Sequence, residues 1–219
     1  MNPQETKNVP KRNFQREMDK LLEDMKNSGQ VKKLFLHCCC APCSSYVLEY
    51  LSNYFQITAF FYNPNIDTDE EYSYRQRELI RFIKEKNFEN PVEIVCGDYQ
   101  PEKFEKIAKG YEDCKEGGAR CMRCFDLRLR ETAKLAKEYK ADFFATTLTV
   151  SPLKNAQAIN AIGEKIGKEF EIEYLPSDFK KKNGYKRTIE LSREFDLYRQ
   201  NFCGCSYSKN SRKIIADLQ

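Results

Sequence analysis

The sequence predicts a single α/β domain in which helices cover both faces of a mostly parallel sheet. Three observations support this prediction. Short apolar runs rich in β-branched and aromatic residues alternate with longer segments whose apolar residues recur every three or four positions, as in strands and amphipathic helices. The 219 residues can bury one substantial core. No internal repeat, low-complexity tract or Gly/Ser linker divides the chain, so we expect one sheet.

Residues 1–30 are expected to form an N-terminal extension, and residues 31–219 the α/β domain. In the extension, apolar residues recur at helical spacing between Lys11 and Lys26, and Gly29 is a typical helix stop. We interpret this segment as an amphipathic helix that packs on the domain.

The domain begins with a short buried strand, and further strands are expected where β-branched and aromatic residues cluster. These strands are Val31–His37, Ile57–Tyr62, Val92–Cys96, Phe143–Val150 and Ile172–Leu175. Between them, apolar residues spaced three and four positions apart indicate helices. The helices are Ser44–Phe55, Asp69–Lys86, Pro101–Lys109, Cys124–Tyr139, Asn155–Phe170 and, closing the chain, Ser208–Leu218.

This alternation also predicts where a ligand would bind. In doubly wound sheets, ligands lie beyond the carboxyl ends of the strands, where the strand order reverses. The first strand leads into a cysteine cluster that starts at Cys38, and the strand that ends at Val150 leads into residues 151–155. We therefore expect both segments to meet at one edge of the sheet.

The composition excludes several classes of protein. Hydrophobic residues make up 41% and charged residues 32%, and a net charge of +4 is too small by itself to indicate nucleic-acid binding. No apolar run approaches the ~20 residues of a membrane-spanning helix, and the charged N-terminus does not resemble a signal peptide. We expect a cytoplasmic protein without membrane contact, whose thiols stay reduced. Ten cysteines beside one histidine then favour metal or redox chemistry over disulfides.

The cysteines fall into three clusters and two single residues. Thiolates on loops can surround iron or zinc in tetrahedral geometry, and a helix N-terminus stabilises their charge. We expect Cys38 to be structural and Cys96 to be a core residue of its strand, while Cys114 stays open between a spectator and a peripheral role. The clusters are His37-Cys38-Cys39-Cys40-Ala41-Pro42-Cys43, Cys121-Met122-Arg123-Cys124 and Cys203-Gly204-Cys205.

Seven cysteines remain as candidate metal ligands. They exceed one four-ligand site, and they suit a four-thiolate iron–sulfur cluster beside a second metal with three protein ligands and an open position. The ferredoxin cysteine run and the glycine-rich phosphate-binding loops are absent. His37 can ligate metal, act as acid or base, or be a buried structural residue. The seven candidates are Cys39, Cys40, Cys43, Cys121, Cys124, Cys203 and Cys205.

A basic segment, residues 178–187, combines five basic residues with one acid and two aromatics. Such a composition suits phosphate contacts and base stacking, with a solvated loop as the alternative. Residues 197–202 lead directly into Cys203 and suit contacts to a metal ligand or a substrate. The expected nucleic-acid contacts are Lys180, Lys181, Lys182, Lys186, Arg187 and Arg199.

Taken together, these motifs resemble the cobalamin-independent epoxyqueuosine reductase family of the QueH type. The resemblance implies a nucleotide-hydrolase-like (HUP or Rossmann-like) fold, with the seven cysteines holding a 4Fe-4S cluster and a mononuclear metal, which we expect to be iron. Some members have an aspartate among the ligands of the single metal, and Cys43 offers a thiolate if it occupies that position. The resemblance runs in order from about Leu34 to Ser208 and rests on His37–Cys43, Gly117–Phe125, Thr146–Pro152 and Leu197–Cys205.

The implied reaction is the reduction of epoxyqueuosine to queuosine in the anticodon loop of tRNA. The epoxide loses its oxygen as water, which requires two electrons and two protons, from a donor that the sequence does not identify. We expect Cys39, Cys40 and Cys203 at the reacting centre. Tyr198 and His37 are the candidate proton donors, and Tyr198 and Arg199 the candidate contacts to the base.

Two other classes of function stay open at this point. One is an iron–sulfur-dependent tRNA sulfur-transferase, which would need a nucleotide-activating loop where the first strand here ends in cysteines. The other is a zinc-stabilised RNA-binding module without catalysis, which predicts a colourless protein.

Overall fold

The computed structural model describes residues 12–210. Its centre is a five-stranded sheet in which each neighbouring pair of strands is parallel. The strands are β1 (Lys32–Cys38), β2 (Phe55–Phe61), β3 (Val92–Cys96), β4 (Phe143–Thr146) and β5 (Glu173–Tyr174). Their order, β3-β2-β1-β4-β5, is that of Rossmann-like doubly wound sheets. The predicted α/β class with a parallel sheet is confirmed.

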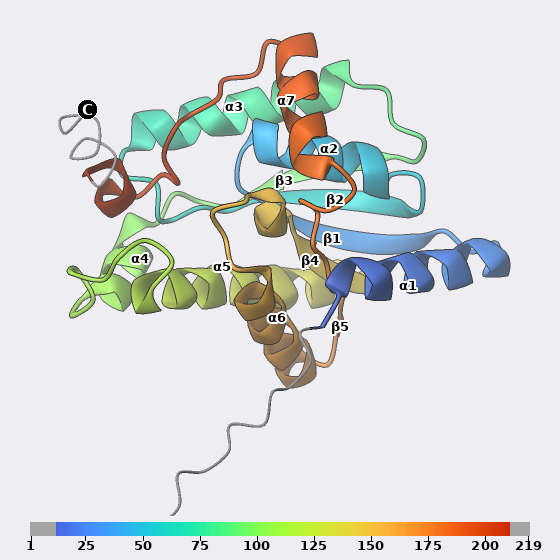
Figure 1. Ribbon diagram of the computed structural model, residues 1–219, viewed down its shortest axis with the longest axis horizontal. Coiled ribbons are helices and arrows are strands. Elements are labelled where there is room, and N and C mark those ends of the chain that lie inside the picture. Colours follow the sequence, from blue (N-terminus) through green and yellow to red (C-terminus); the bar gives the residue numbers. More distant parts are fainter. Residues whose placement is uncertain (1–11, 211–219) are drawn as a thin grey trace, which may run out of the picture.

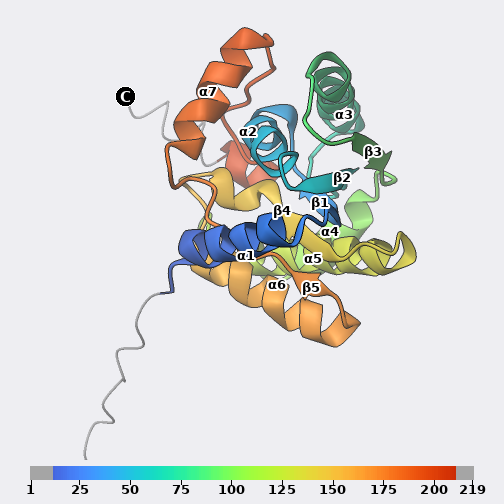
Figure 2. The ribbon, with the colours of Figure 1, turned by 90° about the vertical axis from the view of Figure 1, so that its right-hand side faces the viewer.

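Helices cover both faces of the sheet (Figures 1 and 2). They are α1 (Phe14–Ser28), α2 (Ala41–Leu51), α3 (Asp69–Glu85), α4 (Pro101–Ala108), α5 (Ala119–Glu138), α6 (Ala156–Phe170) and α7 (Gly184–Glu194). On one face lie α2 and α3, with α7 packed against α2, and on the other lie α5 and α6, with α4 beside α5. The apolar face of α1 joins the core on the α2 side through Met18, Leu22 and Met25.

The central strand β1 separates two apolar cores. Its alternate residues Leu34, Leu36 and Cys38 face the core shared with α2 and α3, whereas Phe35 faces the core shared with α5 and α6. Cys38 is fully buried, and burial raises the pKa of its thiol. Its side chain packs in the core on the α2 side, which agrees with the expectation that it is structural.

Strand β4 is shorter than the sequence predicts. The sequence predicts a strand from Phe143 to Val150, but β4 ends at Thr146 and the next four residues form a 3₁₀ turn, η1 (Thr147–Val150). The Thr146 hydroxyl accepts a hydrogen bond from the backbone N–H of Leu148 at 3.2 Å and so starts this turn. The turn redirects the chain across the carboxyl edge of the sheet.

Part of the expected basic loop is helical, because α7 begins at Gly184 within it. A side chain at this position would not fit, since a Cβ atom would lie 1.9 Å from the Phe179 carbonyl oxygen and 2.4 Å from the Tyr46 ring. Lys186 and Arg187 therefore lie in the first turn of a helix that packs on α2.

The prediction that Cys96 is a core residue is wrong. Strand β3 is an edge strand, and Cys96 lies exposed at its end. The expected closing helix extends past Asn210 and so lies mostly outside the described residues, as does Lys11 at the start of the expected first helix. Between residues 12 and 210, no helix combines the length and the apolarity that crossing a membrane requires.

Candidate metal centre and adjoining cavity

The first cysteine cluster lies where the strand order reverses. Strands β1 and β4 are neighbours, but the connection after β1 runs through α2 on one face and the connection after β4 runs through α6 on the other. This crevice is the usual ligand site of doubly wound folds. Two contacts fix the cysteine loop there. The Thr147 hydroxyl accepts a hydrogen bond from the Cys39 N–H at 3.4 Å, and the Asn63 amide donates to the Cys38 carbonyl at 3.0 Å.

Three thiols of this loop can hold a metal ion. The sulfur atoms of Cys39, Cys40 and Cys43 all lie within 4.8 Å of one another. Cys40 is the N-cap of α2 and Cys43 lies in its first turn, where the helix dipole favours thiolate charge. Hydrogen bonds from the Cys39 and Cys43 thiols hold the pKa of Cys40 well below its usual value, whereas the interactions of Cys43 with Cys39 and Cys40 raise the pKa of Cys43. Because the pKa values of Cys39 and Cys43 are raised and that of Cys40 is lowered, Cys40 is the thiol of this cluster that ionises first.

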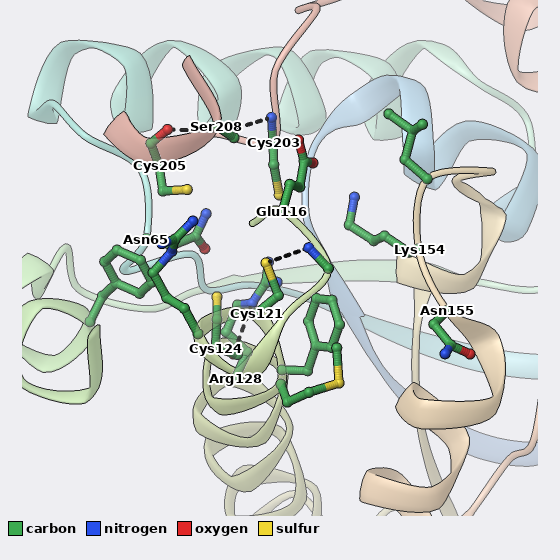
Figure 3. Close-up of a pocket in the computed structure, with 16 residues that line it drawn as sticks. Asn65, Glu116, Cys121, Cys124, Arg128, Lys154, Asn155, Cys203, Cys205 and Ser208 are labelled. Atoms are coloured by element: carbon green, nitrogen blue, oxygen red, sulfur yellow. Dashed lines mark hydrogen bonds between the residues drawn. The ribbon is translucent and has the colours of Figure 1, made fainter. Parts of the chain in front are cut away.

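The other four candidate ligands line a narrow cavity of about 30 Å³ between α5 and the segment that follows Phe202. Figure 3 shows the sulfur atoms of Cys121, Cys124, Cys203 and Cys205 around a common space. The Gly117 N–H donates a hydrogen bond to the Cys121 sulfur at 3.2 Å. Burial raises the pKa of Cys124 to about 12.

Gly204 lets the last cysteine pair approach the rest of the site. Its φ of +129° is accessible mainly to glycine, and a Cβ atom would lie 3.1 Å from Ile66 and 3.2 Å from Arg75. The Ser208 hydroxyl accepts a hydrogen bond from the Cys203 N–H at 3.1 Å and so fixes the segment from its other side.

Three buried arginines lie around these thiols, and the sequence analysis did not identify them as part of the site. Arg75 pairs with Glu71 at 2.7 Å and donates to the Cys203 carbonyl. Within residues 12–210, Arg120 and Arg128 have no carboxylate partner, and Arg120 donates instead to two backbone carbonyls. In each guanidinium one buried nitrogen has no hydrogen-bond partner, namely Nη2 of Arg75, Nε of Arg120 and Nη2 of Arg128.

Arg128 is the most enclosed of the three. Its Nη1 donates to the Asn63 side-chain oxygen at 3.2 Å and its Nε donates to the Cys124 carbonyl at 3.3 Å. Burial opposes its charge, but the thiolates of Cys124, Cys203 and Cys39 outweigh burial and raise the pKa of Arg128. Cys203 lines the narrow cavity beside Arg128 and Cys124 and also lines a second cavity with Cys39, so the three clusters belong to one site.

A second cation, Lys154, reaches the same site from the segment between η1 and α6. Burial opposes its charge too, and the thiolates of Cys203, Cys43 and Cys39 outweigh this effect and raise the pKa of Lys154. Lys154 is partly buried, and a cation withdrawn from water without an anionic partner is costly. An anionic centre made of thiolates and iron or zinc would supply the missing partner, so the residues present fit such a group.

A larger cavity, of about 340 Å³, adjoins the narrow one. The Cys39–Cys43 loop, residues 148–154, the start of α7 and residues 199–203 line it. Four residues line both cavities, and they are Glu116, Leu153, Lys154 and Cys203. A molecule bound in the larger cavity would therefore lie directly against the thiols, and the two segments predicted to meet at this edge do so.

The two residues predicted as proton donors lie elsewhere. His37 is fully buried, its Nδ1 lies 2.9 Å from the Thr146 hydroxyl, and its Nε2 lies 3.0 Å from the Tyr62 carbonyl. Burial lowers the pKa of His37 to about 3, so the ring is neutral. The Tyr198 hydroxyl donates to Glu71, and its ring packs on Tyr74. Neither side chain lines either cavity.

The basic segment is less free than its composition suggests. Lys180 forms an ion pair with Asp178, Lys182 with Asp19, and Arg187 with Glu49. Lys181 and Lys186 are exposed, and the structure gives them no ion pair within residues 12–210. Arg199 lines the larger cavity, and its guanidinium donates to the Thr188 carbonyl and the Ser192 hydroxyl. Tyr185 is 38% exposed at the same cavity.

Sequence reasoning thus found the thiols but missed the cations and Glu116. One signal was present, because Arg128 follows Cys124 by four residues, and positions four apart share one face of a helix. Cys114 lies in the loop between α4 and α5 and lines neither cavity.

The fold and the site define a Rossmann-like α/β protein in which thiols able to bind metal take the place of a phosphate-binding loop. The family model described as epoxyqueuosine reductase QueH matches residues 34–211, and the chain belongs to this family. The family suggested by the sequence motifs is therefore confirmed, and with it an oxidoreductase as the class of enzyme.

Relatives from distant bacteria agree with this assignment. The protein named Epoxyqueuosine reductase QueH from Streptococcus pyogenes serotype M1 is 41% identical over 216 residues, which cover 98% of this chain and 83% of that protein. The protein of the same name from Staphylococcus epidermidis is 40% identical, over 92% of this chain and 87% of that protein. The protein of the same name from Thermotoga maritima is 33% identical, over 82% of this chain and 92% of that protein.

Proposed function

We propose that this protein reduces epoxyqueuosine to queuosine in tRNA, as the last step of queuosine synthesis in the cytoplasm. The observation that carries the proposal is the convergence of seven thiols on two adjoining cavities, in a chain whose relatives are named for this reduction. The larger cavity, at about 340 Å³, has the size of a small-molecule site.

The chemistry sets what the site must provide. Removal of the epoxide oxygen converts the ring C–O–C unit to C=C and water, and it consumes two electrons and two protons. A 4Fe-4S cluster and a mononuclear iron at these thiols would supply electrons one at a time and a Lewis acid for the oxygen. The chain itself orients the substrate in the larger cavity, with Cys39, Cys40 and Cys203 along its inner wall.

The seven thiols are enough for four ligands to a cluster and three to a single metal. The Cys39–Cys43 loop meets the geometric need of a single ion, because its three sulfurs lie within 4.8 Å of one another. The cavity of about 30 Å³ between the other four sulfurs accommodates an ion or a water molecule. A four-iron cluster there would require the side chains around it to move outward, and the ratio of iron to acid-labile sulfide in the purified protein tests whether such a cluster forms.

The tRNA would approach the open side of the larger cavity. A modified base splayed out of the anticodon loop can enter such a cavity, and an aromatic ring at its mouth can stack on a neighbouring base. Tyr185 and Arg199 have this position. Lys181 and Lys186, exposed nearby in sequence and free of ion pairs within residues 12–210, are the best candidates of the basic segment for phosphate contacts.

The test begins with protein purified without oxygen. Its iron and acid-labile sulfide are measured, its visible spectrum is recorded, and it is incubated with tRNA carrying epoxyqueuosine and dithionite. Mass spectrometry of the digested nucleosides then follows the loss of one oxygen. We expect a brown protein that forms queuosine. A colourless protein with zinc and no sulfide would refute the proposed cofactors, and an iron-loaded protein that leaves epoxyqueuosine intact would refute the proposed reaction.

A further inference from the structure

The two cavities meet at Glu116, Leu153, Lys154 and Cys203, and we call this region the passage. It holds a cation, Lys154, to which the proposed function assigns no role. Lys154 lines both cavities, and its side chain extends from the segment before α6 toward Cys203 and Glu116 (Figure 3). A hydrogen bond from its backbone N–H to the Ser151 carbonyl at 3.2 Å fixes the segment. The next residue, Asn155, is the N-cap of α6, so Lys154 directly precedes this helix.

The charge of Lys154 has no fixed partner. Within residues 12–210, the structure records no carboxylate at ion-pair distance from it, and the anions that stabilise its charge are the thiolates of Cys203, Cys43 and Cys39. Metal binding neutralises part of the charge of these thiolates. The ammonium then becomes available to another oxygen anion that forms in the passage, which is where the substrate cavity meets the thiols.

The other charged side chains of the larger cavity are less suited to donate a hydrogen bond to such an anion. Arg75 is held by Glu71 and the Cys203 carbonyl, and Arg199 by Thr188 and Ser192. Besides Lys154, only Glu116 among the charged residues lines both cavities. A carboxylate repels a developing oxygen anion, whereas an ammonium donates hydrogen bonds to it.

We propose that Lys154 is a catalytic residue of the reduction, whose ammonium donates a hydrogen bond to the epoxide oxygen. This inference rests on the proposed function. As two electrons from an external low-potential reductant enter the substrate, both C–O bonds break and the two carbons form a double bond. The oxygen takes up two protons that come from solvent and leaves as water. Lys154 stabilises the negative charge on that oxygen between the first bond cleavage and its protonation.

The decisive variants change this one charge. Loss of a single hydrogen-bond donor to a developing oxyanion costs about 10²–10³ in kcat, so Lys154→Met should lower kcat by that factor with little change in KM. Its iron, its sulfide and its visible spectrum should equal those of the unmodified protein, because Lys154 is not a ligand. Lys154→Arg should retain part of the activity. Lys115→Met removes an exposed lysine beside Glu116 and serves as the matched control.

Chemical rescue separates a catalytic role from a structural one. Added ethylammonium should restore part of the lost kcat in Lys154→Ala, and it should not stimulate the unmodified protein. A Lys154→Met protein with normal iron and kcat within about threefold of normal would overturn the inference, as would a loss of activity that only parallels loss of iron. A defect in Glu116→Gln without one in Lys154→Met would likewise overturn the inference, because the ammonium would then be dispensable. If the unmodified, iron-loaded protein forms no queuosine, the proposed function itself fails.

Discussion

The charge of Arg128 should set how easily the metal centre accepts an electron. Arg128 is buried, has no carboxylate partner within residues 12–210, and interacts with thiolates of all three clusters. A positive charge beside a redox centre favours the reduced form, because reduction adds negative charge. Arg128→Met removes this charge and keeps a side chain of similar length, so the midpoint potential should become more negative.

The size of the shift follows from the position of Arg128. It lies one helical turn after Cys124, and its Nε is 3.3 Å from the Cys124 carbonyl oxygen. The Cβ atoms of residues four apart on a helix lie about 5–6 Å from one another, so we take about 7 Å as the order of magnitude of the distance between the two charges. Two unit charges at about that distance interact by about 2.4 kcal/mol at an effective dielectric constant of about 20. For a one-electron step this corresponds to on the order of 100 mV.

The assay is a redox titration of reconstituted protein, followed by visible and EPR spectroscopy at matched iron content. Arg128→Lys keeps the charge and should shift the potential less than Arg128→Met. Arg123→Met removes an exposed guanidinium from the same helix, where it contacts Tyr111, and should leave the potential unchanged. An Arg128→Met protein with full iron content and a potential within about 20 mV of normal would refute the reasoning, as would an equal shift in Arg123→Met.

Three further predictions concern ligands, tRNA and the proton donor. Cys121→Ser should abolish turnover and visible absorbance together, whereas Cys96→Ser, at an exposed edge position, should preserve both; absorbance and activity that survive in Cys121→Ser would remove it from the ligand set. Lys181→Ala and Lys186→Ala should each weaken tRNA binding. In fluorescence anisotropy titrations, the slope of the logarithm of the binding constant against the logarithm of the salt concentration should become shallower by up to about 0.9. An unchanged slope would exclude phosphate contacts at these two residues. Tyr198→Phe should keep kcat within about twofold, because its hydroxyl contacts Glu71 outside the cavities; a loss of about 10²-fold or more would make Tyr198 the acid after all.

The regular parts of the fold could be predicted because their signals are local. The spacing of apolar residues identified five strands and most of the helices, with errors of up to about five residues at their ends. The η1 turn depends on one hydrogen bond from Leu148 to Thr146, and α7 depends on the close packing of Gly184 against Phe179. Cys96 was misplaced because its sequence neighbours are those of a core strand, and only the strand order makes β3 an edge.

The residues of the candidate site were also only partly predictable from the sequence. Cysteines in clusters are conspicuous because few other roles explain them in a chain without disulfides. A buried arginine has no such signal, since most arginines of amphipathic helices lie in solvent. Arg128 is buried because α5 presents it to the carboxyl edge of the sheet, where Asn63 from the end of β2 receives its hydrogen bond. That contact joins residues 65 positions apart in the chain.

Four cations, to which sequence analysis assigned no role, explain how so many thiolates could share one site. With the proposed cofactors, seven thiolates around a cluster core of roughly +2 and one divalent ion would leave about three negative charges. Arg75 is already neutralised by Glu71. Arg120, Arg128 and Lys154 have no carboxylate partner within residues 12–210, and they supply three positive charges, one of which the carboxylate of Glu116 at both cavities offsets. The oxidised centre and its surroundings would therefore carry about one negative charge, far less than the seven thiolates alone. The small net charge of the whole chain could not reveal this balance, because it depends on which four cations the fold brings to the thiols.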